Sequence, residues 1–150
     1  MKREMWQSDF LSEGKERMAE RNIRFEELGK ERTFALHELQ VRADTNPLAE
    51  ECRQYRVLLD ENEAAYLSFD VWLDELNLYE VFVAEVLRNQ GIGTRIISFA
   101  IDLGKQMGKT RLTVRPRPLS DQPEADLVAW YLRRGFTPTA SPELLEIILA

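Results

Sequence analysis

Two glycines, Gly91 and Gly93, separate a stretch with the hydrophobic period of a β-strand from one with the period of an α-helix. Apolar residues alternate from Leu78 to Leu87, which predicts a strand. After the glycines, apolar side chains recur at helical spacing, at Ile92, Ile96, Ile97, Ala100, Leu103 and Met107. A strand, a glycine turn and a helix start direct several backbone N–H groups and the positive end of the helix dipole towards one point. The sequence therefore predicts an anion site at this turn, above all for a phosphate, which glycine lets approach the backbone.

Three phosphate-binding patterns compete for this region. A dinucleotide fingerprint, G-x-G-x-x-G, fails because Ile96 stands in place of its third glycine. A P-loop fails because segment 104–110 has three residues between its glycines instead of four, and its place at the end of the helix predicts a C-cap. The third pattern, R/Q-x-x-G-x-G/A, is that of an acyl-CoA pyrophosphate loop, and Arg88, Gly91 and Gly93 fit it. A glycine turn that binds no ligand is the structural alternative.

A second motif follows at residues 129–136, Ala-Trp-Tyr-Leu-Arg-Arg-Gly-Phe. Apolar residues form one helical face there, arginines occupy the last turn, and Gly135 ends the helix. This segment is similar to motif B of the GCN5-related N-acetyltransferase (GNAT) family, and segment 83–93 resembles motif A of the same family. The resemblance covers roughly residues 55–149. It implies an α+β fold in which a mixed, mainly antiparallel sheet is flanked by helices and binds acyl-CoA.

The resemblance implies acetyl-CoA as the acyl donor and cosubstrate. Its pyrophosphate would be held by backbone amides around residues 90–94, with Arg88 near the same loop. Its pantetheine arm would lie in a gap between segments 81–85 and 112–115, where backbone N–H groups near Val83 would meet the thioester carbonyl. The implied cofactor-binding residues are Val81, Val83, Arg88, Asn89, Gln90, Gly91, Ile92, Gly93 and Thr94.

Catalytic roles follow from the same resemblance. Tyr131 lies four residues before Gly135, as the tyrosine of the family does, which implies a general acid that protonates the departing thiolate. The alternative is a tyrosine that packs on its amphipathic helix. An attacking amine must also lose a proton, and Glu80 on the motif A strand is the first candidate base. Glu85 and Asp70 are further candidates, and an ordinary solvated role is the alternative for each carboxylate.

Four carboxylates gather around one predicted hairpin, on the side where the family admits the acceptor: Asp70, Asp74, Glu75 and Glu80. Their charge would attract a polyamine, an aminoglycoside or a lysine side chain. A solvated hairpin tip explains the same cluster without a ligand.

Composition excludes several classes of function. The 26 Asp and Glu against 20 Lys and Arg argue against binding nucleic acid through phosphate neutralisation. One cysteine, Cys52, and one histidine, His37, exclude an internal disulfide and argue against a zinc cluster, so no metal is expected. Without a long apolar run or a signal-peptide core, the chain is expected to be soluble, cytoplasmic and not bound to a membrane.

At 150 residues the chain is expected to form a core over residues 51–150, with residues 1–50 as a helical region of the same domain or an appended arm. Helices are predicted from about Ser8 to Leu28 and over 47–54, and segment 33–41 fits strand and helix equally. A β-meander follows, over 55–59, 65–72 and 76–86. Helix 92–107, strand 111–115, helix 124–134 and final strands near Phe136 and 144–149 complete the prediction.

The sequence therefore favours an N-acetyltransferase in which the acetyl group passes directly to a primary amine within a ternary complex. The acceptor would be a small-molecule amine, or a lysine or N-terminus of a protein. The alternative is a catalytically silent protein of the same fold, acting as an acyl-CoA sensor or a protein-interaction module. A homodimer is compatible with either.

Overall fold

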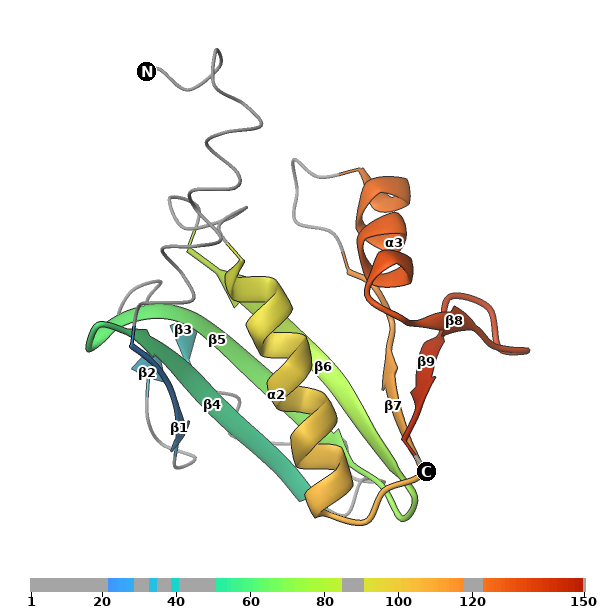
Figure 1. Cartoon of the computed structure of the whole chain (residues 1–150), viewed down its shortest axis with the longest axis horizontal. Coiled ribbons are helices and arrows are strands. Elements are labelled where there is room, and N and C mark those ends of the chain that lie inside the picture. Colours follow the sequence, from blue (N-terminus) through green and yellow to red (C-terminus); the bar gives the residue numbers. More distant parts are fainter. Residues whose placement is uncertain are drawn as a thin grey trace.

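A seven-stranded mixed sheet forms the centre of the computed structural model (Figure 1). The structure describes residues 22–28, 33–34, 39–40, 51–84, 91–117 and 123–149. The strand order is β1-β4-β5-β6-β7-β9-β8, and within this sheet β6 and β7 run parallel while the other neighbours run antiparallel. The strands are β1 Ile23–Leu28, β4 Glu51–Leu59, β5 Asn62–Val71, β6 Glu75–Val83, β7 Arg111–Val114, β8 Thr137–Pro138 and β9 Leu145–Ile148. The predicted fold class, a mixed and mainly antiparallel sheet with helices, is confirmed.

Helix α2, Ile92–Gln106, lies across β4, β5 and β6 and covers one face of the sheet (Figure 1). Its apolar residues recur at the helical period, so one face of the helix is buried against the strands. Gly104 allows a close approach, since a Cβ there would stand 2.6 Å from Cδ1 of Leu149. The helix ends as predicted, because Gly108 has φ 73° and its N–H and that of Lys109 bond to the carbonyls of Lys105 and Gly104.

Helix α3, Glu124–Arg133, follows β7 and precedes the hairpin of β8 and β9. It too was predicted, and it ends before Gly135, which has φ 104°. Within the described residues, no helix is long and apolar enough to cross a membrane.

A β-bulge interrupts the pairing of β5 and β6. Phe69 pairs with Leu78 but Ser68 pairs with Glu80, so Tyr79 is the extra residue on β6. Because side chains alternate along a strand, one extra residue shifts which positions face α2. Before the bulge Leu76 and Leu78 belong to the core under α2. After it, the partly buried residues packed on that core are Val81 and Val83.

The N-terminal helix prediction is wrong for residues 23–28, which form β1, an edge strand antiparallel to β4. Phe25 packs on the core, and its ring stacks on that of Phe99 at 4.1 Å between centroids. Residues 23–28 do alternate between the two faces of the strand, but the high density of charge hid this alternation in the sequence. Arg24 and Glu26 occupy the face opposite Phe25, where Arg24 pairs with Glu61 and Glu26 pairs with Arg56. The earlier part of that predicted helix lies outside the described residues.

The second predicted helix, 47–54, is also wrong where the structure describes it, because β4 already begins at Glu51. Cross-strand pairing with β1 and β5 outweighs the weak local helix signal at this end. The ambiguous segment 33–41 contains two short paired strands, β2 Thr33–Phe34 and β3 Leu39–Gln40.

The role of β1 can be tested by substituting its two faces. Phe25→Ala removes a ring stacked between the sheet and α2, so we expect the free energy of unfolding to fall by about 2–3 kcal/mol. Arg24→Ala removes an exposed ion pair, which solvent screens, and should leave the free energy of unfolding nearly unchanged. Urea denaturation followed by circular dichroism measures both. Equal, small losses would contradict the packing of β1 on the core.

Candidate functional site

Strands β6 and β7 part at the bulge. Their parallel pairing runs from Glu75 and Arg111 to Leu78 and Val114 and ends there. Beyond this point β6 continues to Val83, while the chain leaves β7 through Arg115. The gap was predicted between segments 81–85 and 112–115. That prediction is wrong for residues 112–114, because they are paired with residues 76–78 of β6. The strands diverge after Leu78 and Val114, between residues 79–83 and 115–117.

The predicted anion loop is described from Gly91 onwards. Gly91 is the N-cap of α2 and has φ 95°, in the left-handed region that favours glycine. No side chain caps this helix end, and its first turn contains no acidic residue. Ile92 is buried and anchors the start of the helix in the core. The helix dipole at this end is therefore not opposed by a carboxylate of its own first turn. The predicted loop residues Arg88, Asn89 and Gln90, and also Glu85, lie outside the described residues.

Gly93 and Thr94 contact α3, the helix of the second motif. A Cβ on Gly93 would stand 2.6 Å from Cζ2 of Trp130, so the indole occupies the space that any other side chain would need. The Arg134 guanidinium lies over the Trp130 ring, 3.8 Å from its centroid, and its Nε donates to Oγ1 of Thr94 at 3.2 Å. The two sequence motifs are thus joined by direct contacts, which no pattern in the sequence predicted.

Tyr131 lies on the buried face of α3. Its ring makes edge-to-face contacts with Trp130 and Phe136, at centroid distances of 5.1 and 5.3 Å. The residue is 6% exposed, and this burial raises the pKa of its phenol to about 12. The phenol therefore keeps its proton at neutral pH and can donate it.

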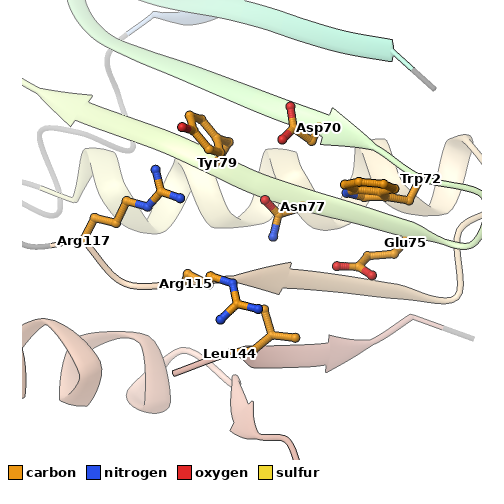
Figure 2. Close-up of a pocket in the computed structure, with 8 residues that line it drawn as sticks. All are labelled: Asp70, Trp72, Glu75, Asn77, Tyr79, Arg115, Arg117 and Leu144. Atoms are coloured by element: carbon orange, nitrogen blue, oxygen red, sulfur yellow. The ribbon is translucent and has the colours of Figure 1, made fainter. Parts of the chain in front are cut away.

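A pocket of ≈ 420 Å³ opens on the face of the sheet opposite α2 (Figure 2). Strands β5 and β6, the segment after β7 and the residue before β9 contribute its walls. Its lining residues are Asp70, Trp72, Glu75, Asn77, Tyr79, Arg115, Arg117 and Leu144.

The predicted site residues divide between this pocket and its surroundings. Asp70 and Glu75 line the pocket, whereas Asp74, Glu80 and Tyr131 do not. Glu80 is half-buried and pairs with Ser68 directly after the bulge. The four predicted carboxylates therefore do not form one cluster around a common space.

The sequence analysis missed the aromatic and basic part of the pocket. Alternation along β6 could have placed Asn77 and Tyr79 on the face opposite Leu76 and Leu78. Arg117 could not be assigned in this way, because it follows the predicted strand 111–115, and Arg115 lies outside β7, which ends at Val114. In the structure the Arg117 guanidinium lies over the Tyr79 ring, 4.2 Å from its centroid, and Nη1 of Arg115 donates to the carbonyl oxygen of Pro142 at 3.2 Å.

Glu75 is engaged by neighbouring residues. Nη2 of Arg111 donates to Glu75 Oε1 at 3.0 Å, and Thr113 donates to Oε2. Nη1 of Arg111 also donates to Glu146 at 2.9 Å, and these carboxylates, Glu146 foremost, raise the pKa of Arg111. Asn77 completes this network with a bond from Nδ2 to Oγ1 of Thr113 at 2.9 Å. Among the described residues, no group of three His, Cys, Asp or Glu side chains is arranged to hold a metal ion.

Solved structures share this fold at low sequence identity. The structure of AtaTR bound with AcCoA superposes with a TM-score of 0.63 at 15% identity, covering 85% of this chain and 94% of that one. A GNAT family acetyltransferase from Elizabethkingia anophelis with acetyl-CoA bound gives 0.61 at 17% identity, covering 85% and 99%. The ribosomal-protein-S18-alanine N-acetyltransferase from Escherichia coli gives 0.54 at 21% identity, covering 67% and 71%.

Sequence comparison extends the resemblance beyond the two motifs. No match was found among curated proteins. The family model for the acetyltransferase (GNAT) family, however, matches residues 6–136 and so reaches well into the N-terminal region, where the motifs gave no resemblance. Because this match spans most of the chain, the protein belongs to the acetyltransferase (GNAT) family.

Proposed function

We propose that the protein is an acetyl-CoA-dependent N-acetyltransferase that moves an acetyl group to a primary amine by direct attack in a ternary complex. The observation that carries this proposal is the bulge at Tyr79, where β6 leaves β7 beside a pocket of charged and aromatic side chains. Membership of the acetyltransferase family supports acetyl-CoA as the donor. A strand divergence next to a pocket supports a reaction between two substrates that approach from different sides.

Donor binding would use the start of α2. The pyrophosphate would be held by backbone N–H groups of the loop Arg88, Asn89, Gln90, Gly91, Ile92, Gly93 and Thr94, with the helix dipole adding positive potential. The absence of acidic residues from the first turn of α2 supports this role. The pantetheine arm would pass along β6, where backbone N–H groups of Val81 and Val83 would donate to the thioester carbonyl oxygen. A single backbone donor at a developing oxyanion is typically worth about 10²–10³ in rate.

The reaction forms one bond and breaks another. The neutral amine nitrogen attacks the thioester carbonyl carbon, a C–N bond forms, and the C–S bond breaks as the tetrahedral intermediate collapses. The nitrogen loses one proton to a carboxylate or to water, and the CoA thiolate takes one proton from the Tyr131 phenol. The phenol is protonated at neutral pH, as a proton donor must be, but burial, which raises its pKa to about 12, makes it a weaker acid than an ordinary tyrosine.

Of the three candidate bases, the structure describes Asp70 and Glu80, while Glu85 lies outside the described residues. Glu80 is next to the bulge, on the strand that would hold the thioester. Asp70 is on β5, is 3% exposed, and lines the pocket that would admit the amine. Proximity to the acceptor is the first requirement for a base, so the pocket favours Asp70 over Glu80.

Donor binding can be tested at Gly91. A Cβ at φ 95° strains the backbone and obstructs the approach of an anion, so we expect Gly91→Val to abolish acetyl-CoA binding in isothermal titration. Gly108→Val is the matched control, because Gly108 also has a positive φ, 73°, and lies in open space at the other end of α2. Both variants carry a similar strain of about 1–2 kcal/mol. Unchanged acetyl-CoA affinity in a folded Gly91→Val protein would overturn the donor site.

The general acid can be tested with Tyr131→Phe, which keeps the ring and removes the proton. We expect turnover to fall ten-fold or more while the dissociation constant of acetyl-CoA stays the same. Tyr55→Phe is the matched control, since burial also raises the pKa of Tyr55 to about 12 but Tyr55 packs against Phe69 and Phe99 under α2. Equal turnover in both variants would remove Tyr131 from the mechanism.

The same Tyr131→Phe variant has a pH signature. The pKa of Tyr131 is about 12 in the folded protein and 10 in the unfolded chain, so the folded state holds the proton more tightly. The resulting stability is complete below pH 10 and is lost as the pH rises to 12, by up to about 2–3 kcal/mol. Between pH 9 and pH 12, the free energy of unfolding measured by denaturation should fall less in Tyr131→Phe than in the wild type.

The two candidate bases can be separated by isosteric substitution. If Asp70 takes the proton of the amine, Asp70→Asn should lower turnover at neutral pH by ten-fold or more, and a higher pH should restore part of it because more of the amine is then neutral. Glu80→Gln serves as the comparison and should leave turnover within a few-fold. The reverse ranking would assign the base to Glu80. Acetyl-CoA binding without CoA release in the wild type, for any amine, would support the alternative of a catalytically silent sensor.

A further inference from the structure

A series of hydrogen bonds runs from the pocket opposite α2 into the sheet beneath it. Nδ2 of Asn77 donates to Oγ1 of Thr113 at 2.9 Å, and the Thr113 hydroxyl donates to Oε2 of Glu75. Oε1 of Glu75 accepts a bond at 3.0 Å from Arg111, which Glu75 shares with Glu146. Thr113 is 0% exposed and does not line the pocket, whereas Asn77 does. The series therefore connects a buried hydroxyl to a side chain that a ligand can reach.

Glu75 fixes the direction of every bond in this series. A carboxylate paired with a guanidinium offers only acceptor oxygens, so Oε2 of Glu75 receives the single proton of the Thr113 hydroxyl. With its proton used, Oγ1 of Thr113 can only accept a further bond, and the amide NH₂ of Asn77 supplies it. The opposite orientation of this amide would place Oδ1 against an oxygen that has no proton to give. Asn77 is therefore held with Nδ2 towards β7.

The same constraint leaves Oδ1 of Asn77 on the pocket side. The amide oxygen and nitrogen diverge from one carbon, so Nδ2 towards β7 puts Oδ1 towards β5 (Figure 2). Among the described residues, the bond to Thr113 is the one side-chain hydrogen bond of Asn77, so none of them donates to Oδ1. Donation from Nδ2 also polarises the amide and strengthens its oxygen as an acceptor. A half-buried acceptor of this kind needs a donor from water or from a ligand.

Distance along β6 separates this oxygen from the reacting atoms of the proposed function. Val81, whose N–H would meet the thioester carbonyl, follows Asn77 beyond the bulge at Tyr79. At about 3.3 Å per residue, shortened by the bulge, the two positions are roughly 10–13 Å apart. A hydrogen bond covers only about 3 Å at each end of this span. A group bound at Oδ1 is therefore distinct from the amine that attacks the thioester, and a few atoms join the two.

We propose that Oδ1 of Asn77 binds a second polar group of the acceptor, one that donates a hydrogen bond, such as a hydroxyl or an ammonium group. Thr113 is the positioning residue, because it holds the amide of Asn77 in the orientation that exposes Oδ1. An acceptor with a methyl group or an ether oxygen at this place displaces water from Oδ1 without replacing its hydrogen bond. The identity of the attacking amine rests on the proposed function, but the binding of a donor group to Oδ1 does not.

Titration calorimetry without acetyl-CoA tests the binding, with amines that differ at the far end. 5-Amino-1-pentanol and 1,5-diaminopentane carry a hydroxyl and an ammonium group there, n-hexylamine a methyl group and 5-methoxypentylamine an ether oxygen. We expect at least one of the two donor-bearing amines to bind about ten-fold more tightly than n-hexylamine and the ether. The hydroxyl and the ammonium group are thereby distinguished. The inference is overturned if neither donor-bearing amine binds, or if n-hexylamine or the ether binds as tightly as both.

Variants assign the preference to the Asn77 amide. Asn77→Leu has a similar size but no Oδ1, and should weaken the donor-bearing amine about ten-fold without weakening n-hexylamine. Thr113→Val should act in the same direction although it does not touch the pocket, and Thr113→Ser, which keeps the hydroxyl, should restore the preference. Thr110→Val is the matched control, since the Thr110 hydroxyl donates at 3.0 Å to the carbonyl oxygen of Asp74. An equal loss in Thr110→Val, or a full preference in Asn77→Leu, would overturn the assignment.

The held amide also has a signature that needs no ligand. In ¹⁵N-labelled protein, the side-chain NH₂ protons of Asn77 should exchange with water more slowly in the wild type and in Thr113→Ser than in Thr113→Val, because the hydrogen bond to Oγ1 protects them. Circular dichroism confirms that each variant is folded. Equal exchange rates in wild type and Thr113→Val would refute the positioning role of Thr113.

Thiol release with acetyl-CoA separates this inference from the proposed function. A binding preference that depends on Asn77, without CoA release for any of the four amines, would support the inference and refute the acetyltransferase. CoA release with equal KM for the donor-bearing amine and n-hexylamine, in wild type and in Asn77→Leu, would support the acetyltransferase and refute the inference.

Discussion

One extra residue in β6 determines the geometry on which the rest of the site depends. At Tyr79 the pairing with β5 shifts register, and the pairing with β7 ends immediately before it. The shift turns Val81 and Val83 towards α2 and leaves Tyr79 on the pocket face. A bulge bends a strand and increases its twist, which accounts for the separation of two strands that begin as parallel neighbours. The proposed donor gap and the proposed acceptor pocket are two consequences of this local defect.

A second constraint joins the two helices that carry the motifs. Trp130 packs where Gly93 has no side chain, and Arg134 bridges the indole to Thr94 at the start of α2. The position of Tyr131 on α3 therefore depends on the glycine turn that precedes α2. Glycine at this turn is therefore required for close packing whether or not an anion binds there.

The acidic residues counted along the hairpin do not by themselves describe the charge of the pocket, whose lining contains two carboxylates and two arginines. The hairpin residues counted as one acidic cluster are separated by the pleat of the sheet and by the bulge, and Glu75 is held by Arg111 and Thr113. Arg115 and Arg117 reach the same space from the segment after β7. An electrostatic argument about an acceptor therefore needs the side chains that meet in space, because opposite charges within a few ångströms cancel most of the field.

The sequence by itself determined the elements whose hydrophobic period is strong and local: the strand before Gly91, helix α2 with its glycine C-cap, helix α3 and the β-meander. Its two motifs also identified the family, which the family model then showed over residues 6–136. Tertiary structure decided the rest. Residues 23–28 became a strand because β4 offers an edge on which Phe25 can be buried, and local helix propensity is too weak to oppose that gain. The register shift at Tyr79, the contact of Gly93 with Trp130 and the arginines of the pocket all join residues that are distant along the chain. No local pattern contains such contacts, since they arise from pairing and packing between whole elements.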